Sequence, residues 1–438
     1  MSGNKYHIII WIALTLVITG CGLFTRAQSP QEKPTPVAPP KEETAVVDQP
    51  RDTARKIVKD TVGKFAIDKT KKWNKKSIYS VCMVLPFSTD AGELEKLLAE
   101  ENITGYQPLA AVEFYEGALM ALDTLDSLHI NLDIQVFNHF KDSSLTAALF
   151  SKPEIRNTDV IIGPVFNEGL KAASVVAQEE EIFLVSPLSP MHQFTDSNRY
   201  FMMANPPAVS QIEEMLSYAQ DSFATANIIC VYRTDKPIEA KLAQEFKDAF
   251  QHVNKGRMQL HETYSFSGVS DALQAQGNYV FIASFDELYT NGLIRDLSKI
   301  SRTTPLTLMG LPHVLSFESV SIDYYENLHF TYPASYYIDR LAPKVRDFEN
   351  AFAAKYETRP SDYACRGYDM MLYIGMMLNT YGPDLGASAA SYNPAERYML
   401  FPFHFAPVLD TDGNIDHMEN TTIRILRFDQ FRFEVVNQ

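Results

Sequence analysis

The chain has 438 residues, of which 46% are apolar and 12% aromatic, with 39 Lys and Arg against 54 Asp and Glu. This apolar fraction excludes a disordered chain, and four cysteines are too few for a disulfide scaffold. The formal charge of −15 argues against nucleic-acid binding, because phosphate recognition needs a basic surface. At roughly 100–200 residues per domain, the length allows two or three domains.

The charge is distributed unevenly along the chain. Residues 1–77 hold 14 Lys and Arg against 7 Asp and Glu, which leaves 25 against 47 for the rest. A basic leader therefore precedes an acidic body.

Residues 1–20 have the pattern of a signal peptide. Lys5 precedes an apolar run from Ile8 to Ile18, which is short for a bilayer span. The run ends in Ile-Thr-Gly-Cys, and this sequence around Cys21 resembles the lipobox of bacterial lipoproteins. The resemblance implies cleavage before Cys21 and lipid attachment to its sulfur, so that the body is anchored to a membrane outside the cytoplasm, in the periplasm of a Gram-negative cell. An ordinary secretory signal or an uncleaved anchor is the alternative.

Residues 21–77 are expected to form a tether. Gln28–Pro50 is rich in Pro, Glu, Lys, Gln and Thr, which is typical of an extended, disordered linker. Arg51–Lys76 is basic and has apolar residues near helical spacing. It is interpreted either as a solvated linker or as a short amphipathic helix lying on anionic lipid.

From Ser77 onward, strand and helix patterns alternate. Short apolar runs predict buried strands at Tyr79–Pro86, Leu132–Phe137, Asp159–Pro164 and Ile182–Val185. Helical spacing between them predicts helices at Val112–Leu125, Ser144–Phe150 and Gly169–Glu181. Strands separated by helices in this way form βαβ units and a parallel sheet.

The pattern starts again after Asn205-Pro206-Pro207. The second half has expected strands at Ala226–Tyr232, Tyr279–Ala283 and Pro305–Gly310, and expected helices at Ile212–Tyr218, Ile238–Val253 and Leu293–Ile300. Helices are then expected at Val345–Tyr356 and Gly367–Leu378. The tail, Phe401–Val436, predicts antiparallel strands around the turn at Asp412-Gly413-Asn414. The fold class is therefore α/β with two successive halves.

Five segments carry a resemblance to a known family. They are Val84–Ser88, Phe114–Ala121, Asp159–Pro164, Phe183–Pro190 and Gly367–Met371. In this order and spacing they resemble type I periplasmic binding proteins, the leucine-binding-like, branched-chain amino-acid receptors of ABC transporters. The resemblance implies two Rossmann-like lobes joined by a three-strand hinge that closes around a ligand in the cleft. The implied lobes are residues 78–206 with 333–388, and residues 207–332 with 389–438.

The expected ligand contacts lie where parallel strands end, because ligands of open α/β sheets bind beyond the carboxyl ends of the strands. They are Phe87, Ser88, Gly163, Asn167, Ser186 and Ser189 in one lobe and Tyr232, Asp286 and Glu287 in the other. The glycine lets backbone approach a ligand, and N–H groups of the helix after Asn167 suit a carboxylate. The serines supply hydroxyls, the second set accepts from an ammonium group, and Phe87 and Phe166 stack on an apolar part.

Each of these contacts has a structural alternative. Ser186 and Ser189 lie in a proline-flanked turn, where hydroxyls often satisfy local backbone. Asn167 stands where the family commonly has a small hydroxyl residue, so it is equally a helix cap. Asp286 and Glu287 also fit a solvated helix start.

The sequence gives no sign of enzymatic, metal or cofactor chemistry. It lacks Gly-x-Gly-x-x-Gly, Walker, His-Glu-x-x-His and Gly-x-Ser-x-Gly motifs, and no His shares a metal-ligand spacing with another His or a Cys. Cys82, Cys230 and Cys365 are expected to be core thiols. Asp410–Asp416 resembles part of a calcium loop but lacks its sixth-place Gly and twelfth-place Glu, which favours a polar β-turn.

Two functions follow from these expectations. The first is a lipid-tethered receptor that captures a small, polar, amino-acid-like metabolite for an ABC transporter. The alternative is a non-transport regulatory lipoprotein of the same fold whose partner is a cell-wall (peptidoglycan) synthesis protein. The long tether and the departure from the family pattern at Asn167 favour the alternative.

Overall fold

The computed structural model describes residues 56–57, 76–87, 107–139, 142–165, 167–191, 193–195, 197–222, 225–386 and 392–437. The predicted signal peptide, Cys21, Ser88, Phe166 and nearly all of the tether lie outside these ranges. No helix within them is long and apolar enough to cross a membrane.

The first sheet has eight strands in the order β1-β12-β13-β6-β5-β4-β2-β3. They are β1 (Lys56–Ile57), β2 (Tyr79–Leu85), β3 (Leu132–Asn138), β4 (Val160–Ile162), β5 (Phe183–Ser186), β6 (Phe201–Met203), β12 (Phe405–Leu409) and β13 (Ile415–Asn420). The six strands from β13 to β3 pair in parallel, whereas β12 is antiparallel to both of its neighbours.

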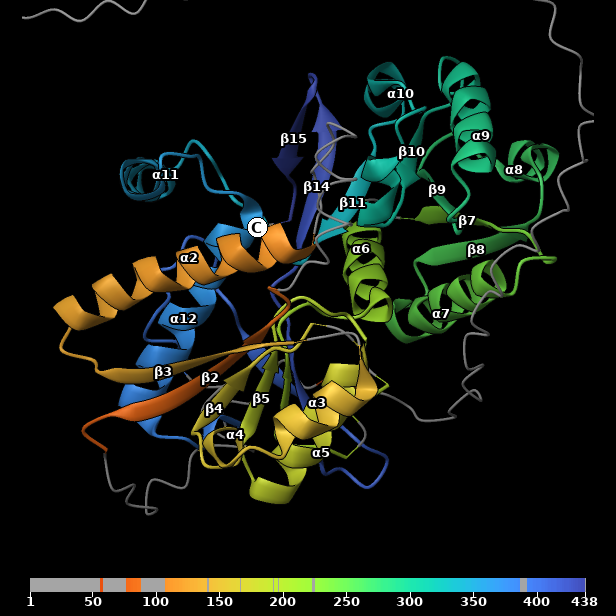
Figure 1. The fold of residues 1–438 in the computed structure, drawn as a ribbon. Coiled ribbons are helices and arrows are strands. Elements are labelled where there is room, and N and C mark those ends of the chain that lie inside the picture. The colour runs from red at the N-terminus through yellow and green to blue at the C-terminus, as the bar shows by residue number, and fades with distance from the viewer. Residues whose placement is uncertain are drawn as a thin grey trace, which may run out of the picture. The chain divides into compact units, whose positions relative to one another are not determined.

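Helices cover both faces of this sheet (Figure 1). One face carries α2 (Gln107–Ser127), α11 (Pro343–Tyr356) and α12 (Asp362–Tyr381), and the other carries α3 (Ser143–Phe150), α4 (Pro153–Arg156) and α5 (Asn167–Glu180). In β2, Val81 and Met83 pack on the first group of helices and Cys82 and Val84 on the second. Burial on both faces explains the continuous apolar run in this strand.

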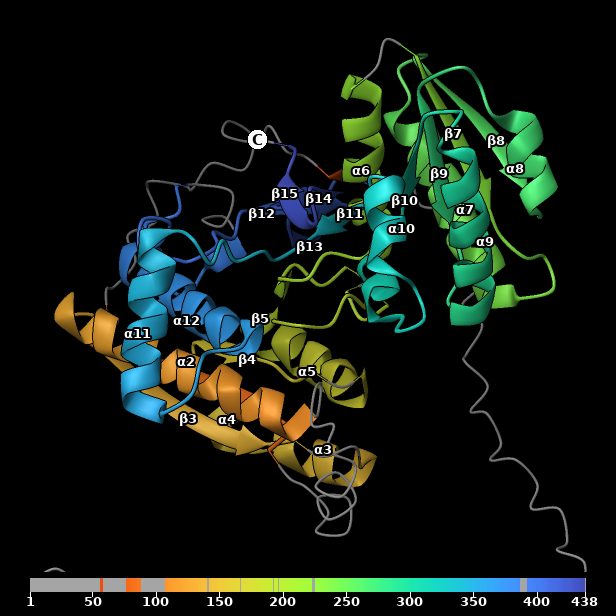
Figure 2. The ribbon, with the colours of Figure 1, turned by 90° about the horizontal axis from the view of Figure 1, so that it is seen from above.

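Two glycines explain how closely α2 and α12 approach each other. A Cβ atom on Gly117 would lie 1.8 Å from the Ala364 carbonyl oxygen, and one on Gly367 would lie 1.9 Å from that of Phe114. Figure 2 shows α2 and α12 crossing beside α11. The glycines within two of the resembling segments therefore permit helix–helix packing.

The second sheet has seven strands in the order β15-β14-β11-β10-β9-β7-β8. They are β7 (Ala226–Val231), β8 (Met258–Thr263), β9 (Asn278–Ile282), β10 (Leu306–Met309), β11 (Thr331–Ala334), β14 (Arg424–Asp429) and β15 (Arg432–Val435). Its helices are α6 (Ala208–Ser222) and α7 (Pro237–Val253) on one face and α8 (Phe266–Ala272), α9 (Glu287–Ile300) and α10 (Ile322–Asn327) on the other. A 3-10 turn, η1 (Pro312–Ser316), follows β10.

The chain passes between the two sheets three times, at residues 204–207, 335–342 and 421–423. The structure thus confirms the expected α/β fold of two lobes joined by three connections. The first crossover includes the expected boundary at residue 206, the second begins two residues after the expected start of its segment at residue 333, and the third lies much later than residue 389. The sequence places residues 389–438 in the second lobe, whereas β13 pairs in parallel with β6 of the first sheet through Met418 and Met202. Only β14 and β15 of the tail join the second sheet.

Candidate functional site

A cavity of about 610 Å³ lies beside the crossovers, and both sheets contribute to its walls. We call it the inter-sheet cavity. Pro190 follows β5 of the first sheet, and Phe285 follows β9 of the second, so the carboxyl ends of strands from both lobes meet here. Its lining comprises Pro190, Asn205, Ala208, Gln211, Ile238, Lys241, Leu242, Glu245, Phe285, Leu311, Pro312, His313, Leu315, Tyr332, Ala334, Ser335, Tyr336 and Arg366.

Hydrogen bonds connect the crossovers beside this cavity. The Ser335 hydroxyl donates to Asn205 Oδ1 at 2.6 Å, and Asn205 Nδ2 donates to the Leu188 carbonyl at 2.8 Å. On the third crossover side, Asn420 Nδ2 donates to the Ala204 carbonyl at 3.1 Å. The polar side chains therefore fix the three connections relative to the strand ends.

Arg366 of α12 is the half-buried cation of the cavity. Its guanidinium lies 4.5 Å from the ring centre of Tyr336, and it forms no ion pair with any carboxylate in the described part of the chain. Burial lowers the pKa of the guanidinium, but arginine stays protonated in proteins. The cavity thus contains a positive charge without a protein counter-charge beside it.

A buried carboxylate positions Tyr336. Asp369 accepts hydrogen bonds from the Tyr336 hydroxyl at 2.7 Å and from the backbone N–H groups of Leu400 and Phe401 at 2.7 and 2.9 Å. Burial raises the pKa of Asp369 to about 7, although these three donors favour the charged form. Asp369 therefore links α12, the second crossover and the loop before β12.

The opposite wall of the cavity is apolar. Ile238 and Phe285 are 63% and 44% exposed, and Leu315 beside them is also exposed. The Phe285 ring lies 4.6 Å from that of His313, whose Nε2 donates to the Ser284 carbonyl at 3.0 Å. Burial lowers the pKa of His313, which favours its neutral form. This wall suits an apolar part of a ligand.

Gln211 of α6 lines the cavity and contains a buried hydrogen-bond acceptor. Its side chain is 8% exposed, and its Nε2 donates to the Pro206 carbonyl at 2.8 Å. Because a carbonyl only accepts, this contact fixes the amide orientation and leaves Oε1 as the acceptor. Oε1 is buried and has no partner within the described ranges.

None of the predicted ligand contacts that the structure describes lines this cavity, although Pro190 and Phe285 are immediate neighbours of two of them. Gly163 has φ +85°, and a Cβ there would lie 2.2 Å from the Val84 carbonyl oxygen, so it permits close packing of strand ends. Ser186 and Ser189 are buried; the Ser186 hydroxyl donates to the Ser189 carbonyl at 3.5 Å, and Ser189 Oγ accepts from the Met191 N–H at 3.3 Å.

The predicted carboxylates of the second lobe have protein partners. Asp286 caps α9 by accepting from the Tyr289 N–H at 3.0 Å and pairs with Arg233 Nη1 at 3.1 Å, and these two contacts lower its pKa. Glu287 accepts from the Ser319 N–H at 2.7 Å, which lowers its pKa.

The remaining predicted ligand contacts are the aromatic residues Tyr232 and Phe87, together with Asn167. The Tyr232 hydroxyl donates to Glu262 at 3.0 Å, and the Phe87 ring packs edge-on against Tyr115 at 5.9 Å. Asn167 is the first residue of α5, and its side chain is not among those described. Contact of all nine residues with a ligand stays a prediction.

A buried ion pair stands next to Asp286. Glu239 is 1% exposed, and it is bonded by Arg233 through both carboxylate oxygens and by the Ser284 hydroxyl at 2.7 Å. Burial alone would raise the pKa of Glu239, but these donors lower it overall. The Arg233 charge is therefore neutralised within the protein.

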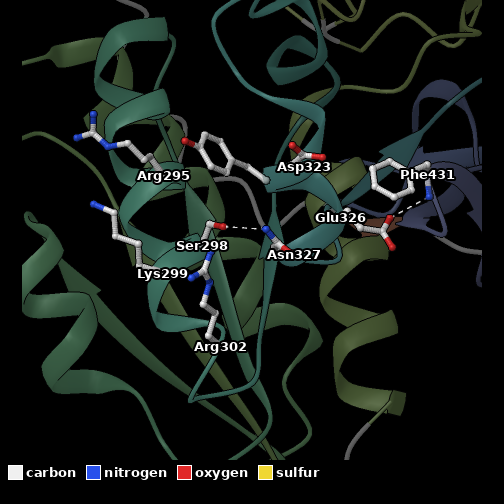
Figure 3. A pocket seen from close by; sticks show the side chains of 9 residues that line it. Arg295, Ser298, Lys299, Arg302, Asp323, Glu326, Asn327 and Phe431 are labelled. Carbon is white, nitrogen blue, oxygen red and sulfur yellow. Dashed lines mark hydrogen bonds between the residues drawn. The ribbon is translucent and has the colours of Figure 1, made fainter.

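A second pocket, of about 420 Å³, lies on the outer side of α9 and α10 (Figure 3). Arg295, Lys299 and Arg302 of α9 or its end line it, together with Phe431. Asn327 Nδ2 donates to Ser298 Oγ at 3.2 Å across it. Its cations point in different directions in Figure 3 and do not converge on one point.

The acidic turn and the cysteines show no metal-binding arrangement in the part of the chain that the structure describes. In the described ranges no three His, Cys, Asp or Glu side chains are grouped to hold a metal. Asp410 accepts from the N–H groups of Asp412 and Asn414, which confirms the polar turn. Cys82, Cys230 and Cys365 are buried, as expected. Burial raises the pKa of Cys82 to about 11, that of Cys365 to about 12 and that of Cys230 further.

Comparison with known proteins agrees with this arrangement. Residues 115–384 match the family model described as the receptor family ligand binding region. No curated protein matches the chain.

Several solved structures share the fold. An ABC-type branched-chain amino acid transporter protein from Rhodopseudomonas palustris is 13% identical with a TM-score of 0.55, covering 82% of this chain and 95% of that one. A branched-chain amino acid ABC transporter periplasmic ligand-binding protein from Burkholderia xenovorans is 12% identical with a TM-score of 0.54, covering 82% and 94%. An ABC transporter substrate-binding protein from Desulfitobacterium hafniense, in complex with Leu, is 14% identical with a TM-score of 0.50, covering 82% and 100%.

At these identities the solved structures establish the fold, and the family match covers more than half of the chain. They confirm the resemblance found in the sequence. The chain therefore belongs to the receptor ligand-binding-region family and has the fold of a type I periplasmic binding protein.

Proposed function

We propose that this chain is a solute-binding receptor that captures a small, polar, amino-acid-like metabolite in the inter-sheet cavity. The observation that carries this proposal is the cavity itself, whose walls come from both lobes and from the crossovers between them. Its volume of about 610 Å³ is within the range typical of small-molecule sites. The fold and family are those of ligand-binding receptors.

Closure about the three crossovers is the proposed mode of capture. Ile238, Phe285 and Leu315 are exposed on the wall of the second lobe, and a ligand seated on them would bury this apolar surface. A ligand that contacts both lobes stabilises the closed arrangement over the open one. Ser186, Ser189 and Asp286 remain the predicted additional contacts in a closed cleft.

Delivery of the ligand to an ABC permease, lipid attachment at Cys21 and an extracytoplasmic location belong to the same proposal. The solved relatives from Rhodopseudomonas palustris, Burkholderia xenovorans and Desulfitobacterium hafniense are ABC transporter proteins, and this supports the transport role. The lipobox-like sequence before Cys21 supports the tether.

Thermal stability tests ligand binding. The full chain is freed of bound metabolites by dialysis in mild denaturant, refolded and screened against amino acids and small carboxylic acids. A ligand at 100 times its Kd adds about 2.7 kcal/mol to the unfolding free energy, so a true ligand raises the Tm measurably.

The variant A208W is the control, because it places an indole inside the cavity at a partly exposed lining position and obstructs the ligand. We expect the Tm increase in the wild type and its loss in A208W. A screen without any stabilising compound would contradict the receptor function and favour the regulatory alternative.

A further inference from the structure

We propose that the ligand carries a carboxylate and that Arg366 is the residue that binds it. This inference rests on the proposed function, and it assigns the charge of the ligand and the group that recognises it.

The first step is that the Arg366 guanidinium has N–H donors available for a ligand. The guanidinium carbon lies 4.5 Å from the centre of the Tyr336 ring, and this cation–π contact uses none of the five N–H donors of arginine in a hydrogen bond. No carboxylate of the described residues lies within 4.0 Å of it. A half-buried cation is costly without a counter-charge, and an oxyanion from the ligand would supply one.

The second step is that the nearest candidate carboxylate is bound elsewhere. Asp362 lies one turn before Arg366 on α12, at the spacing that commonly forms a helical ion pair. Asp362 instead accepts from Arg340 Nη2 at 2.5 Å, and Arg340 also pairs with Glu349 at 2.6 Å. The arrangement of α12 therefore leaves Arg366 available on the cavity side.

The third step concerns the other groups of the cavity. Lys241 and Glu245 have opposite charges one turn apart on α7. Their charges balance, so Arg366 gives the residues that line the cavity a net positive charge. Gln211 Oε1 has no partner among the described residues, and a small movement of this lining side chain would let it accept from an N–H or O–H donor of the ligand. Phe285 supplies apolar surface beside them. These groups together fit a carboxylate with one donor group and an apolar part.

The choice of a carboxylate over a phosphate follows from the number of charges. A single guanidinium matches a planar, singly charged carboxylate through two parallel hydrogen bonds. A phosphate carries more charge and more acceptors than one arginine satisfies, and the charge of the second cation of the lining, Lys241, is balanced by Glu245 one turn along α7.

Titration calorimetry on the metabolite-free full chain tests the inference. The probes are L-leucine, L-phenylalanine and phenylacetate, each with its matched amide, and inorganic phosphate. We expect at least one carboxylate to bind the wild type, with its amide about 10- to 100-fold weaker. The variant R366Q should bind the same carboxylate more weakly by a similar factor. The variant R366K should retain part of the affinity because it keeps the positive charge.

The control is R302Q, which makes the same change at an exposed arginine outside this cavity and should leave the Kd unchanged. Melting curves of R366Q and R302Q establish that both variants are folded. Equal binding of an amide and its carboxylate, tighter binding of phosphate, or an unchanged Kd in R366Q would each overturn the inference while the receptor function stands. If no probe and no compound of the thermal screen binds the wild type, the receptor function falls, and this inference falls with it.

Discussion

The Tyr336 hydroxyl donates a 2.7 Å hydrogen bond to the Asp369 carboxylate. The ring of the same tyrosine contacts the Arg366 guanidinium. Tyr336 follows β11 on the second crossover, and Asp369 and Arg366 belong to α12. A buried acid, a crossover residue and the cavity cation are thus joined in one contact chain. Changes in this chain are expected to alter both stability and ligand affinity.

The first prediction concerns the hydroxyl of Tyr336. The variant Y336F removes a donor from a buried carboxylate, so the unfolding free energy should fall by about 1–3 kcal/mol in urea denaturation. Tyr373 is the matched control, because its hydroxyl is also buried but has no hydrogen-bond partner in the described structure. We expect Y373F to be neutral or stabilising. Equal losses in the two variants would contradict a structural role for the contact with Asp369.

The second prediction is a pH dependence caused by Asp369. Its pKa is raised from the ordinary value of 3.8 to about 7, with burial as the largest cause. The folded state therefore holds a proton that the unfolded state has released between these values. The stabilisation is complete below about pH 4 and is lost as the pH rises through 7.

Denaturation of the wild type and D369N from pH 4 to pH 8 measures this effect. The difference in unfolding free energy between the two proteins should shrink as pH rises, by up to about 1.4 kcal/mol per pH unit. Other titrating groups cancel in the difference. If the difference stays flat or grows with pH, Asp369 is charged in the folded protein and the prediction fails.

The third prediction separates the cost of a positive φ from the cost of a steric clash when alanine replaces glycine. Gly163 and Gly256 have φ +85° and +80°, but a Cβ meets the Val84 carbonyl only at Gly163 and open space at Gly256. G256A should therefore lose about 1 kcal/mol for the backbone conformation alone. G163A should lose about 1–3 kcal/mol more, because the strand ends must move apart. Similar losses by chemical denaturation would show that the close approach has no energetic consequence.

The fourth prediction concerns the buried pair of Glu239 and Arg233. The variant E239A leaves the Arg233 charge and the Ser284 hydroxyl without their partner, so it should cost about 3–5 kcal/mol. E179A is the comparison, because Glu179 pairs with Arg156 at the exposed surface, where such pairs contribute about 0–1 kcal/mol. Equal effects on the midpoint of urea denaturation would refute the distinction.

The sequence predicted the parallel strands because burial on both faces leaves continuous apolar runs such as Tyr79–Leu85. It did not predict β8, whose sequence Met-Gln-Leu-His-Glu-Thr belongs to a polar edge strand. It also misplaced the third crossover. The alternation in residues 405–435 indicates antiparallel strands, but alternation is the same whichever sheet a strand joins.

The prediction of the site came close to the cavity and missed its cation. Ligands of open α/β sheets bind beyond the carboxyl ends of the strands, and this principle predicts Ser189 and Asp286. The cavity is lined by their sequence neighbours Pro190 and Phe285. The sequence does not predict Arg366 as a site residue, because the apolar pattern of α12 is typical of a core helix. A signal was present, since Arg366 is the one basic residue in the apolar sequence of Asp362–Tyr381.

Native mass spectrometry of the full chain, purified from the cells that make it, tests the occupied cavity most directly. The account predicts that the wild type retains a small bound molecule, which is released on denaturation, and that A208W purified in parallel retains none. An equal amount of the same molecule on both proteins would place it outside the inter-sheet cavity and contradict the central claim.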